Sequence, residues 1–103
     1  MIVRMWRGAV KVEDAEAYAA YIDETGMAAY GETAGNRGAY MLRRERDGLM
    51  EFVTVSMWDD MDAVKAFAGD EPERAVFYPE DDGFLVERDE TVLHYEVPRS
   101  VNL

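Results

Sequence analysis

The segment LMEFVTVSMW, residues 49–58, is hydrophobic on both faces when it is written as a β-strand. One face carries Val53, Val55 and Met57, and the other carries Phe52 and Trp58. Residues 1–8, MIVRMWRG, show the same pattern and are closed by a glycine. Side chains alternate between the faces of a strand, so a sheet with these two strands at its centre has to be covered on both sides.

Helical spacing begins at Asp14, where apolar side chains recur every three to four residues, and we expect Gly26 to end this helix. The glycine-rich stretch 31–38 predicts a loop. Residues 39–47 predict a charged edge strand, joined to 49–58 by a hairpin turn at Asp47 and Gly48.

The second half of the chain predicts mostly short elements. A helix starts near Asp59 or Asp60 and ends at Gly69. Pro72 is well placed to start another short helix over 72–78. We expect an acidic connection over 80–89 and a last strand over 91–97.

The resulting order, β-α-β-β-α-(α)-β, is that of an α+β, ferredoxin-like fold in a single domain over 1–103. Its first and third strands are central. Two short helices cover only one face of such a sheet, while both faces need burial. A second copy of the chain is the simplest cover, so we predict a homodimer with sheet-to-sheet packing.

Composition excludes several classes of protein and site. The absence of cysteine excludes disulfides and cysteine-ligated zinc or iron–sulfur sites, and the single histidine excludes sites that need two. With 22 acidic and 11 basic residues, the chain is a poor nucleic-acid binder. No apolar run is long enough to span a membrane, and the MIVRMWRG start lacks the apolar stretch of a signal peptide. We therefore expect a cytoplasmic protein.

The chain resembles the antibiotic-biosynthesis-monooxygenase family, whose members are dimeric α+β barrels. The resemblance spans nearly the whole chain and rests on Trp6 and Gly8, on TAGNRG at 33–38, on Trp58, on FAGDEPERAVFYPEDDGFL at 67–85 and on the closing HYEV at 94–97. These motifs specify the fold better than the chemistry, because this superfamily includes oxygenases, isomerases, haem-degrading enzymes and proteins without known activity.

The resemblance implies two enzymatic functions. Oxygenases of the family work without a cofactor: a phenolic substrate loses a proton, and its carbanion passes an electron to dioxygen. Haem-degrading members carry an asparagine on the first strand, a tryptophan on the second helix and a histidine beyond it. The corresponding positions here hold Met5, Phe67 and Phe77, so we do not expect haem degradation. The strand asparagine of some oxygenases is also absent.

His94 and Arg4 are the candidate catalytic residues. His94 is the natural general base, because histidine alone has an unperturbed pKa near neutrality; the alternative is a structural histidine bound to a carboxylate. Arg4 lies in an apolar central strand, so it needs an anionic partner. That partner is either a bound phenolate, carboxylate or enolate, or Glu51 or Glu96, paired with Arg4 across the sheet or across the dimer interface.

A substrate pocket is expected between helices and sheet, and its candidate residues are Met5, Trp6, Tyr40, Trp58, Phe67, Phe77 and Tyr78. Most aromatic residues at such spacings only fill a core. Glu80, Asp81 and Asp82 do not match a known metal loop, so we expect no metal and no cofactor. The resemblance thus implies a cofactor-independent monooxygenase, or a related proton-transfer enzyme, acting on a small aromatic or polyketide-like molecule. A non-catalytic dimer that binds a small molecule is the alternative.

Overall fold

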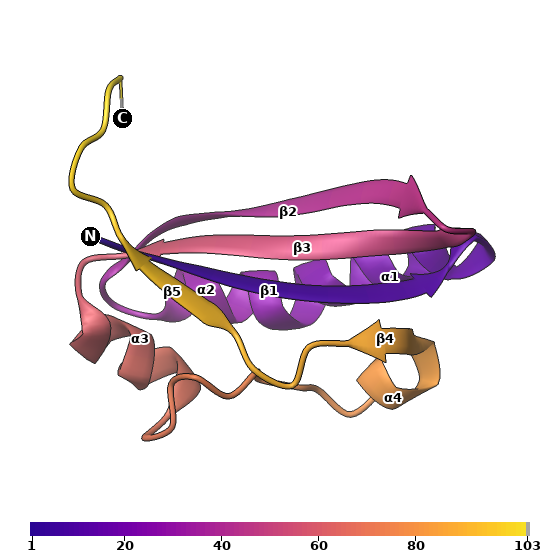
Figure 1. The fold of residues 1–103 in the computed structure, drawn as a ribbon. Helices are drawn as coiled ribbons and strands as arrows, with labels where there is room; N and C mark the ends of the chain where they lie inside the picture. Colours follow the sequence, from indigo (N-terminus) through magenta and orange to yellow (C-terminus); the bar gives the residue numbers. More distant parts are fainter. Residues whose placement is uncertain (103) are drawn as a thin grey trace.

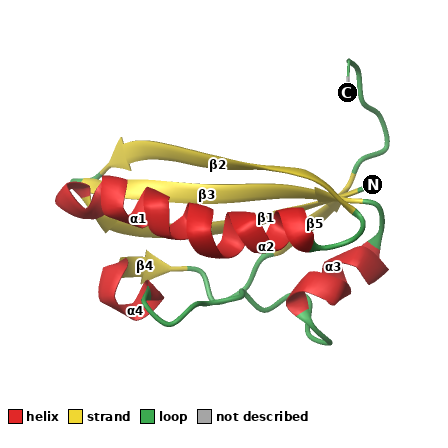
Figure 2. Ribbon diagram, turned by 180° about the vertical axis from the view of Figure 1, so that it is seen from behind, coloured by secondary structure: helices red, strands yellow, loops and turns green. Residues whose placement is uncertain are grey.

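An antiparallel sheet forms one layer of the structure, and a long helical segment lies along one of its faces (Figures 1 and 2). The computed structural model describes residues 1–102. The sheet consists of β1 (Ile2–Lys11), β2 (Asn36–Arg46), β3 (Leu49–Trp58), β4 (Leu85–Arg88) and β5 (Leu93–Glu96). Its order is β2-β3-β1-β4, and β5 pairs with the other end of β1. This topology confirms the ferredoxin-like α+β fold with its first and third strands at the centre.

The helical layer begins with a 3-10 turn, η1 (Val12–Asp14), and continues through α1 (Ala15–Ile22), a π-helical turn η2 (Asp23–Met27) and α2 (Ala28–Glu32). Figure 2 shows these elements as one continuous run along the sheet. The two remaining helices are α3 (Met61–Ala68) and the short α4 (Asp81–Phe84). Among the helices described, none has the length and hydropathy needed to cross a membrane.

Strand register decides which side chains face the helices. Arg4 lies opposite Ser56, and Trp6 lies opposite Thr54, so these four side chains share one face of the sheet. This inner face also carries Val10, Phe52 and Trp58, each of which is fully buried. The side chains between them, such as Met5 and Val55, point to the outer face.

The outer face has no helix over it in the described part of the chain, and it is the face that Figure 1 presents to the reader. Its hydrophobic side chains include Val3, Met5, Tyr40, Leu42, Val53, Val55, Met57, Leu93 and Tyr95. Tyr40 is 62% exposed and Leu93 is 59% exposed, although both belong to the sheet. The sheet therefore leaves a hydrophobic surface without a cover within residues 1–102.

Three predicted turns and helix ends are confirmed by the structure. The hairpin between β2 and β3 turns at Asp47 and Gly48, which both have positive φ, as a type I′ turn requires. Asp60 caps α3 by accepting a hydrogen bond from the Ala63 backbone N–H. Gly69 ends α3 with a φ of 87°, a conformation that favours glycine.

The first helix is longer than the prediction. Gly26 does not end it, because the chain passes through η2 in a helical conformation and continues to Glu32. The predicted loop over 31–38 therefore shrinks, and β2 already begins at Asn36. A glycine signals the end of a helix through its preference for positive φ, but Gly26 does not adopt one.

The helix predicted over 72–78 is wrong: Pro72 and Glu73 form a turn, and the residues that follow it up to 78 are not helical. Backbone groups of this segment bond outside it: the Ala75 N–H donates to the Glu90 carbonyl, and the Glu73 carbonyl accepts from Val92. The acidic connection over 80–89 instead contains α4 and β4, and β4 pairs with β1. Phe84 and Leu85 pack against the core, which explains why this acidic stretch is ordered.

Glu51 is the centre of a charge cluster at one end of the outer face. Its carboxylate accepts hydrogen bonds from Arg44 at 2.8 Å, from Arg7 at 2.5 Å and from Arg46 at 2.7 Å. The carboxylate side chain is only 7% exposed. The three arginines, Arg44 foremost, hold the pKa of Glu51 at about 2, below its usual 4.5.

The Glu51 cluster predicts acid-sensitive stability. The pKa is lower in the folded state, so the stabilisation is present above pH 4.5 and is lost as the pH falls from 4.5 to about 2. Glu51→Gln should lower the Tm at pH 7, and its Tm difference from wild type should shrink across that range. Glu45→Gln, an exposed change on the same hairpin, is the control. A Tm difference that is the same at pH 7 and pH 2.5 would contradict this assignment.

Candidate functional site

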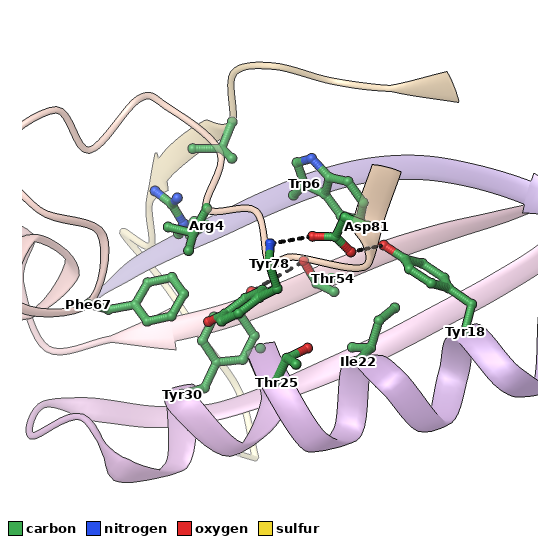
Figure 3. Close-up of a pocket in the computed structure, with 13 residues that line it drawn as sticks. Arg4, Trp6, Tyr18, Ile22, Thr25, Tyr30, Thr54, Phe67, Tyr78 and Asp81 are labelled. Carbon is green, nitrogen blue, oxygen red and sulfur yellow. Dashed lines mark hydrogen bonds between the residues drawn. The ribbon is translucent and has the colours of Figure 1, made fainter. Parts of the chain in front are cut away.

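A cavity of about 50 Å³ lies between the inner face of the sheet and the helices (Figure 3). Its wall combines β1, β3, α1, η2, α2, α3, α4, the segment before α4 and the residue before β5. The lining residues are Arg4, Trp6, Tyr18, Ile22, Thr25, Gly26, Tyr30, Thr54, Phe67, Val76, Tyr78, Asp81 and Val92. Most of these side chains are aromatic or aliphatic, with a few polar groups among them, as is usual in sites for small molecules.

Trp6 reaches the cavity across Gly8. A Cβ at Gly8 would lie 2.5 Å from the Trp6 ring, so only glycine leaves room for the indole to lie along the strand. The Trp6 Nε1 donates to the Asp89 carbonyl at 2.8 Å. These contacts fix the indole at the wall and explain why a bulky ring and a glycine occur two residues apart.

Arg4 brings a buried positive charge to the cavity. It is 3% exposed, and its Nη atoms donate to the backbone carbonyls of Pro72 and Arg74. Within residues 1–102 the guanidinium makes no ion pair, so the suggested pairing with Glu51 or Glu96 across the sheet of the same chain is wrong. Glu51 lies on the outer face, bound to other arginines. Burial lowers the pKa of Arg4, but an arginine stays protonated near neutrality.

His94 lies beside Arg4 on the neighbouring strand, since β5 pairs Arg4 with His94. The His94 Nε2 is 3.0 Å from an Arg4 Nη1. An arginine only donates hydrogen bonds, so Nε2 is the acceptor and the imidazole is neutral. Burial and then the Arg4 charge lower the pKa of His94, which keeps the ring neutral at pH 7.

Asp81 brings a buried carboxylate to the cavity. It is 6% exposed. Its Oδ2 accepts from the Tyr78 backbone N–H at 2.6 Å, and its Oδ1 accepts from the Tyr18 hydroxyl at 3.3 Å (Figure 3). Burial and the Asp81 charge raise the pKa of Tyr18, so this phenol remains a donor. No cation pairs with Asp81 among the described residues; its neighbour Asp82 pairs with Arg88.

The structure brings together only some of the residues that the sequence suggests for the pocket. Arg4, Trp6, Phe67 and Tyr78 line the cavity. His94 is not in the wall but contacts it through Arg4. Met5 and Tyr40 point to the outer face. Trp58 is fully buried in the core beside Phe67 and Tyr30, and Phe77 packs edge-on against Trp6 and under Arg88.

The predicted set of pocket residues lacked several polar groups of the cavity wall, among them Tyr18, Thr54 and Asp81. Tyr18 and Thr54 look like ordinary core positions of an amphipathic helix and a central strand. Asp81 lies in the acidic run Glu80-Asp81-Asp82, where a solvated carboxylate is the usual expectation. The Tyr-Pro-Glu-Asp order around residue 78 was the available signal, because aspartate accepts from backbone N–H groups three residues away.

Comparison with known proteins identifies the fold. No family model and no curated protein matches this chain. A solved structure of a Bacillus cereus protein named as an antibiotic biosynthesis monooxygenase is 18% identical, with a TM-score of 0.68 over 99% of this chain and 97% of its own.

Two further similar structures carry the name of an activity. MhuD from Mycobacterium tuberculosis, described as a heme-degrader with two hemes bound, is 17% identical, with a TM-score of 0.66 over 99% of this chain and 100% of its own. A variant of SnoaB from Streptomyces nogalater, a cofactor-independent oxygenase, is 16% identical, with a TM-score of 0.60 over 99% and 97% of the two chains. At such identities the likeness establishes the fold, and this confirms the resemblance to antibiotic biosynthesis monooxygenases at that level.

Proposed function

We propose that this chain is a cofactor-independent monooxygenase that acts on a small, acidic phenol in the cavity beside Arg4. One observation carries the proposal: in the described part of the chain, a buried guanidinium that forms no ion pair stands in the wall of an aromatic cavity. A buried charge is costly unless it is paired, and a bound phenolate or enolate supplies the missing negative charge. The fold shared with SnoaB is consistent with oxygenase chemistry.

Arg4 and His94 have different roles in this proposal. The Arg4 guanidinium holds the oxyanion of the phenol and stabilises the charge that spreads into its ring. The His94 Nε2 lone pair is occupied by Arg4, and a protonated His94 would put two cations in contact. We therefore assign His94 as a positioning residue, which orients the guanidinium, and not as the base.

The cavity limits the size of the substrate. A space of about 50 Å³ holds roughly three to five water molecules, so a ring system enters only if part of the wall moves. We expect the segment over 72–78 to move, since it contributes Val76 and Tyr78 to the wall. It is held by backbone bonds to residues 90–92, by the bonds of Arg4 to two of its carbonyls and by the bond of the Tyr78 N–H to Asp81, so some of these bonds have to lengthen or break when a ring enters. One- or two-ring phenols are the substrates expected.

Haem has to be considered as a cofactor, because MhuD, which has a similar fold, binds it. The cavity residues of this chain do not provide a histidine ligand for haem iron. Phe77, at the position that the resemblance gives to the histidine ligand, has no donor atom. His94 uses its Nε2 on Arg4. Haem therefore enters no step of the proposed reaction.

The reaction needs no reductant. A ring C–H of the phenolate becomes a carbonyl, one atom of dioxygen enters the product, and the other leaves as water together with two hydrogens of the substrate. For 1,3-dihydroxynaphthalene the product is 2-hydroxy-1,4-naphthoquinone. The protein supplies the anion site and a water-poor cavity.

Oxygen uptake with 1,3-dihydroxynaphthalene tests the proposal. We expect consumption of one dioxygen per quinone formed, faster than in buffer, with one oxygen-18 atom in the product when labelled dioxygen is used. Uptake at the buffer rate despite saturable binding of the naphthol would instead support the non-catalytic binding protein. Neither uptake nor binding would contradict both functions.

We also propose that the protein is a homodimer in which the outer sheet faces pack together. The support is the hydrophobic outer face described above, whose central residues are flanked by exposed Tyr40, Leu42, Leu93 and Tyr95. A two-fold interface uses the same patch on both copies. The chain carries a net charge of −11, but the charges at the end of this face form the Glu51 cluster with its arginines. A second copy is thus not repelled by excess acid there.

A further inference from the structure

Two buried charges stand in the wall of one cavity without an ion-pair partner among residues 1–102. Arg4 is one of them, and the proposed function uses it as the anion holder. Asp81 is the other, and the proposed function has no role for it. Both residues are at least nine-tenths buried, and in the view of Figure 3 Tyr78 lies between them.

We propose that Asp81 is the proton acceptor of the reaction, which takes the acidic C–H proton of a substrate whose oxygen is held by Arg4. This inference rests on the proposed function, because it uses the same cavity and the same class of substrate. It names the group that removes the proton before dioxygen reacts.

The hydrogen bonds of Asp81 leave it able to act as a base. The Tyr78 backbone N–H binds Oδ2 and fixes the carboxylate at the wall. The contact of Oδ1 with the Tyr18 hydroxyl is 3.3 Å, longer than the usual range of about 2.5–3.0 Å for a hydroxyl donor. Each carboxylate oxygen has two lone pairs, so an acceptor position remains on the oxygen that Tyr18 binds weakly.

The surroundings of Asp81 limit the water that competes with a substrate for its carboxylate. Tyr18 is 2% exposed and Trp6 lines the same wall, so bulk water has little access to the carboxylate. The burial that raises the pKa of Tyr18 also keeps its hydroxyl protonated. Tyr18 therefore donates to Asp81 and does not compete with it as the base.

The step is a proton transfer that balances without an oxidant. In the keto form of 1,3-dihydroxynaphthalene, the C–H bond of the acidic ring carbon breaks and an O–H bond forms on the Asp81 carboxylate. The electron pair moves into the ring and ends on the substrate oxygen beside Arg4. The product is the phenolate, which is the species that the proposed function delivers to dioxygen.

Anaerobic hydrogen–deuterium exchange isolates this step from oxygenation. In D₂O without oxygen, the wild-type protein should incorporate deuterium into the acidic ring carbons of 1,3-dihydroxynaphthalene faster than buffer does. Asp81→Asn should reduce the protein-dependent rate by about a hundredfold, as expected for the loss of a general base. Asp82→Asn removes a charge from the adjacent, exposed residue and should exchange like wild type.

The outcomes separate the two proposals. Exchange that occurs in wild type and is lost in Asp81→Asn, without oxygen uptake, would overturn the monooxygenase but support Asp81 as the acceptor. Wild-type exchange rates in Asp81→Asn, or a wild-type protein that does not accelerate exchange, would overturn the role of Asp81 even if oxygen uptake is observed. Asp81→Ser retains an oxygen for the Tyr78 N–H and repeats the test if the asparagine variant does not fold.

Discussion

Arg4→Met is expected to weaken the binding of 1,3-dihydroxynaphthalene at least tenfold and to lower the oxygenation rate at least as much. Hydrogen bonds to charged groups contribute about 1.5–3 kcal/mol each, and the substitution removes both the charge and its donors. Methionine has a similar length, so the neighbouring aromatic side chains keep a contact. Fluorescence titration of the naphthol measures the affinity.

Two further variants make the Arg4 prediction specific. Arg4→Lys keeps the charge but cannot bond two carbonyls, His94 and a ligand in one plane, so its affinity should lie between those of wild type and Arg4→Met. Arg43→Met removes an arginine that pairs with Glu16 at the surface and should bind like wild type. If Arg4→Met folds, as judged by its circular dichroism, and binds the naphthol like wild type, Arg4 does not hold the anion.

Val55→Glu is expected to convert the dimer into a monomer. Val55 lies at the middle of the outer face, between Met5 on β1 and Tyr40 on β2. In a sheet-to-sheet dimer the change would bury two carboxylates without partners, which costs several kcal/mol. In the monomer the same side chain reaches water, so the fold itself should survive. Sedimentation velocity at concentrations where wild type is dimeric measures the change.

The control for this prediction adds the same charge elsewhere. Ala20 is exposed on α1, on the helical side of the sheet, so Ala20→Glu should sediment as wild type. A dimeric Val55→Glu protein would show that the outer face is not the interface. A wild-type protein that sediments as a monomer would show that this face has no second copy on it.

The central part of the fold was predictable because local signals and long-range packing agree there. The doubly hydrophobic segment 49–58 lies in the centre of the sheet, and the Asp-Gly turn places β2 beside it. The chain after residue 70 was less predictable. Pro72 marks a helix start in local terms, but the backbone groups of that segment bond to residues 90–92 and to Arg4. Such tertiary partners leave no local pattern.

The candidate site shows the same limit. Arg4 was identifiable because a charge in a hydrophobic strand needs a partner, and the sequence already indicated that this partner is an anion. Its partners could not be identified, since two of them are backbone carbonyls of a segment nearly seventy residues away. Asp81 was hidden in an acidic run, where only the folded chain distinguishes the buried carboxylate from exposed Asp82.

A crystal structure of the protein with 1,3-dihydroxynaphthalene, grown without oxygen, tests the account most directly. We predict the naphthol between the sheet and the helices, with one oxygen within hydrogen-bond distance of the Arg4 guanidinium and an acidic ring carbon facing Asp81. The segment over 72–78 should be displaced to admit the rings. A naphthol bound elsewhere, with Arg4 and Asp81 facing an unchanged cavity, would contradict the proposed site.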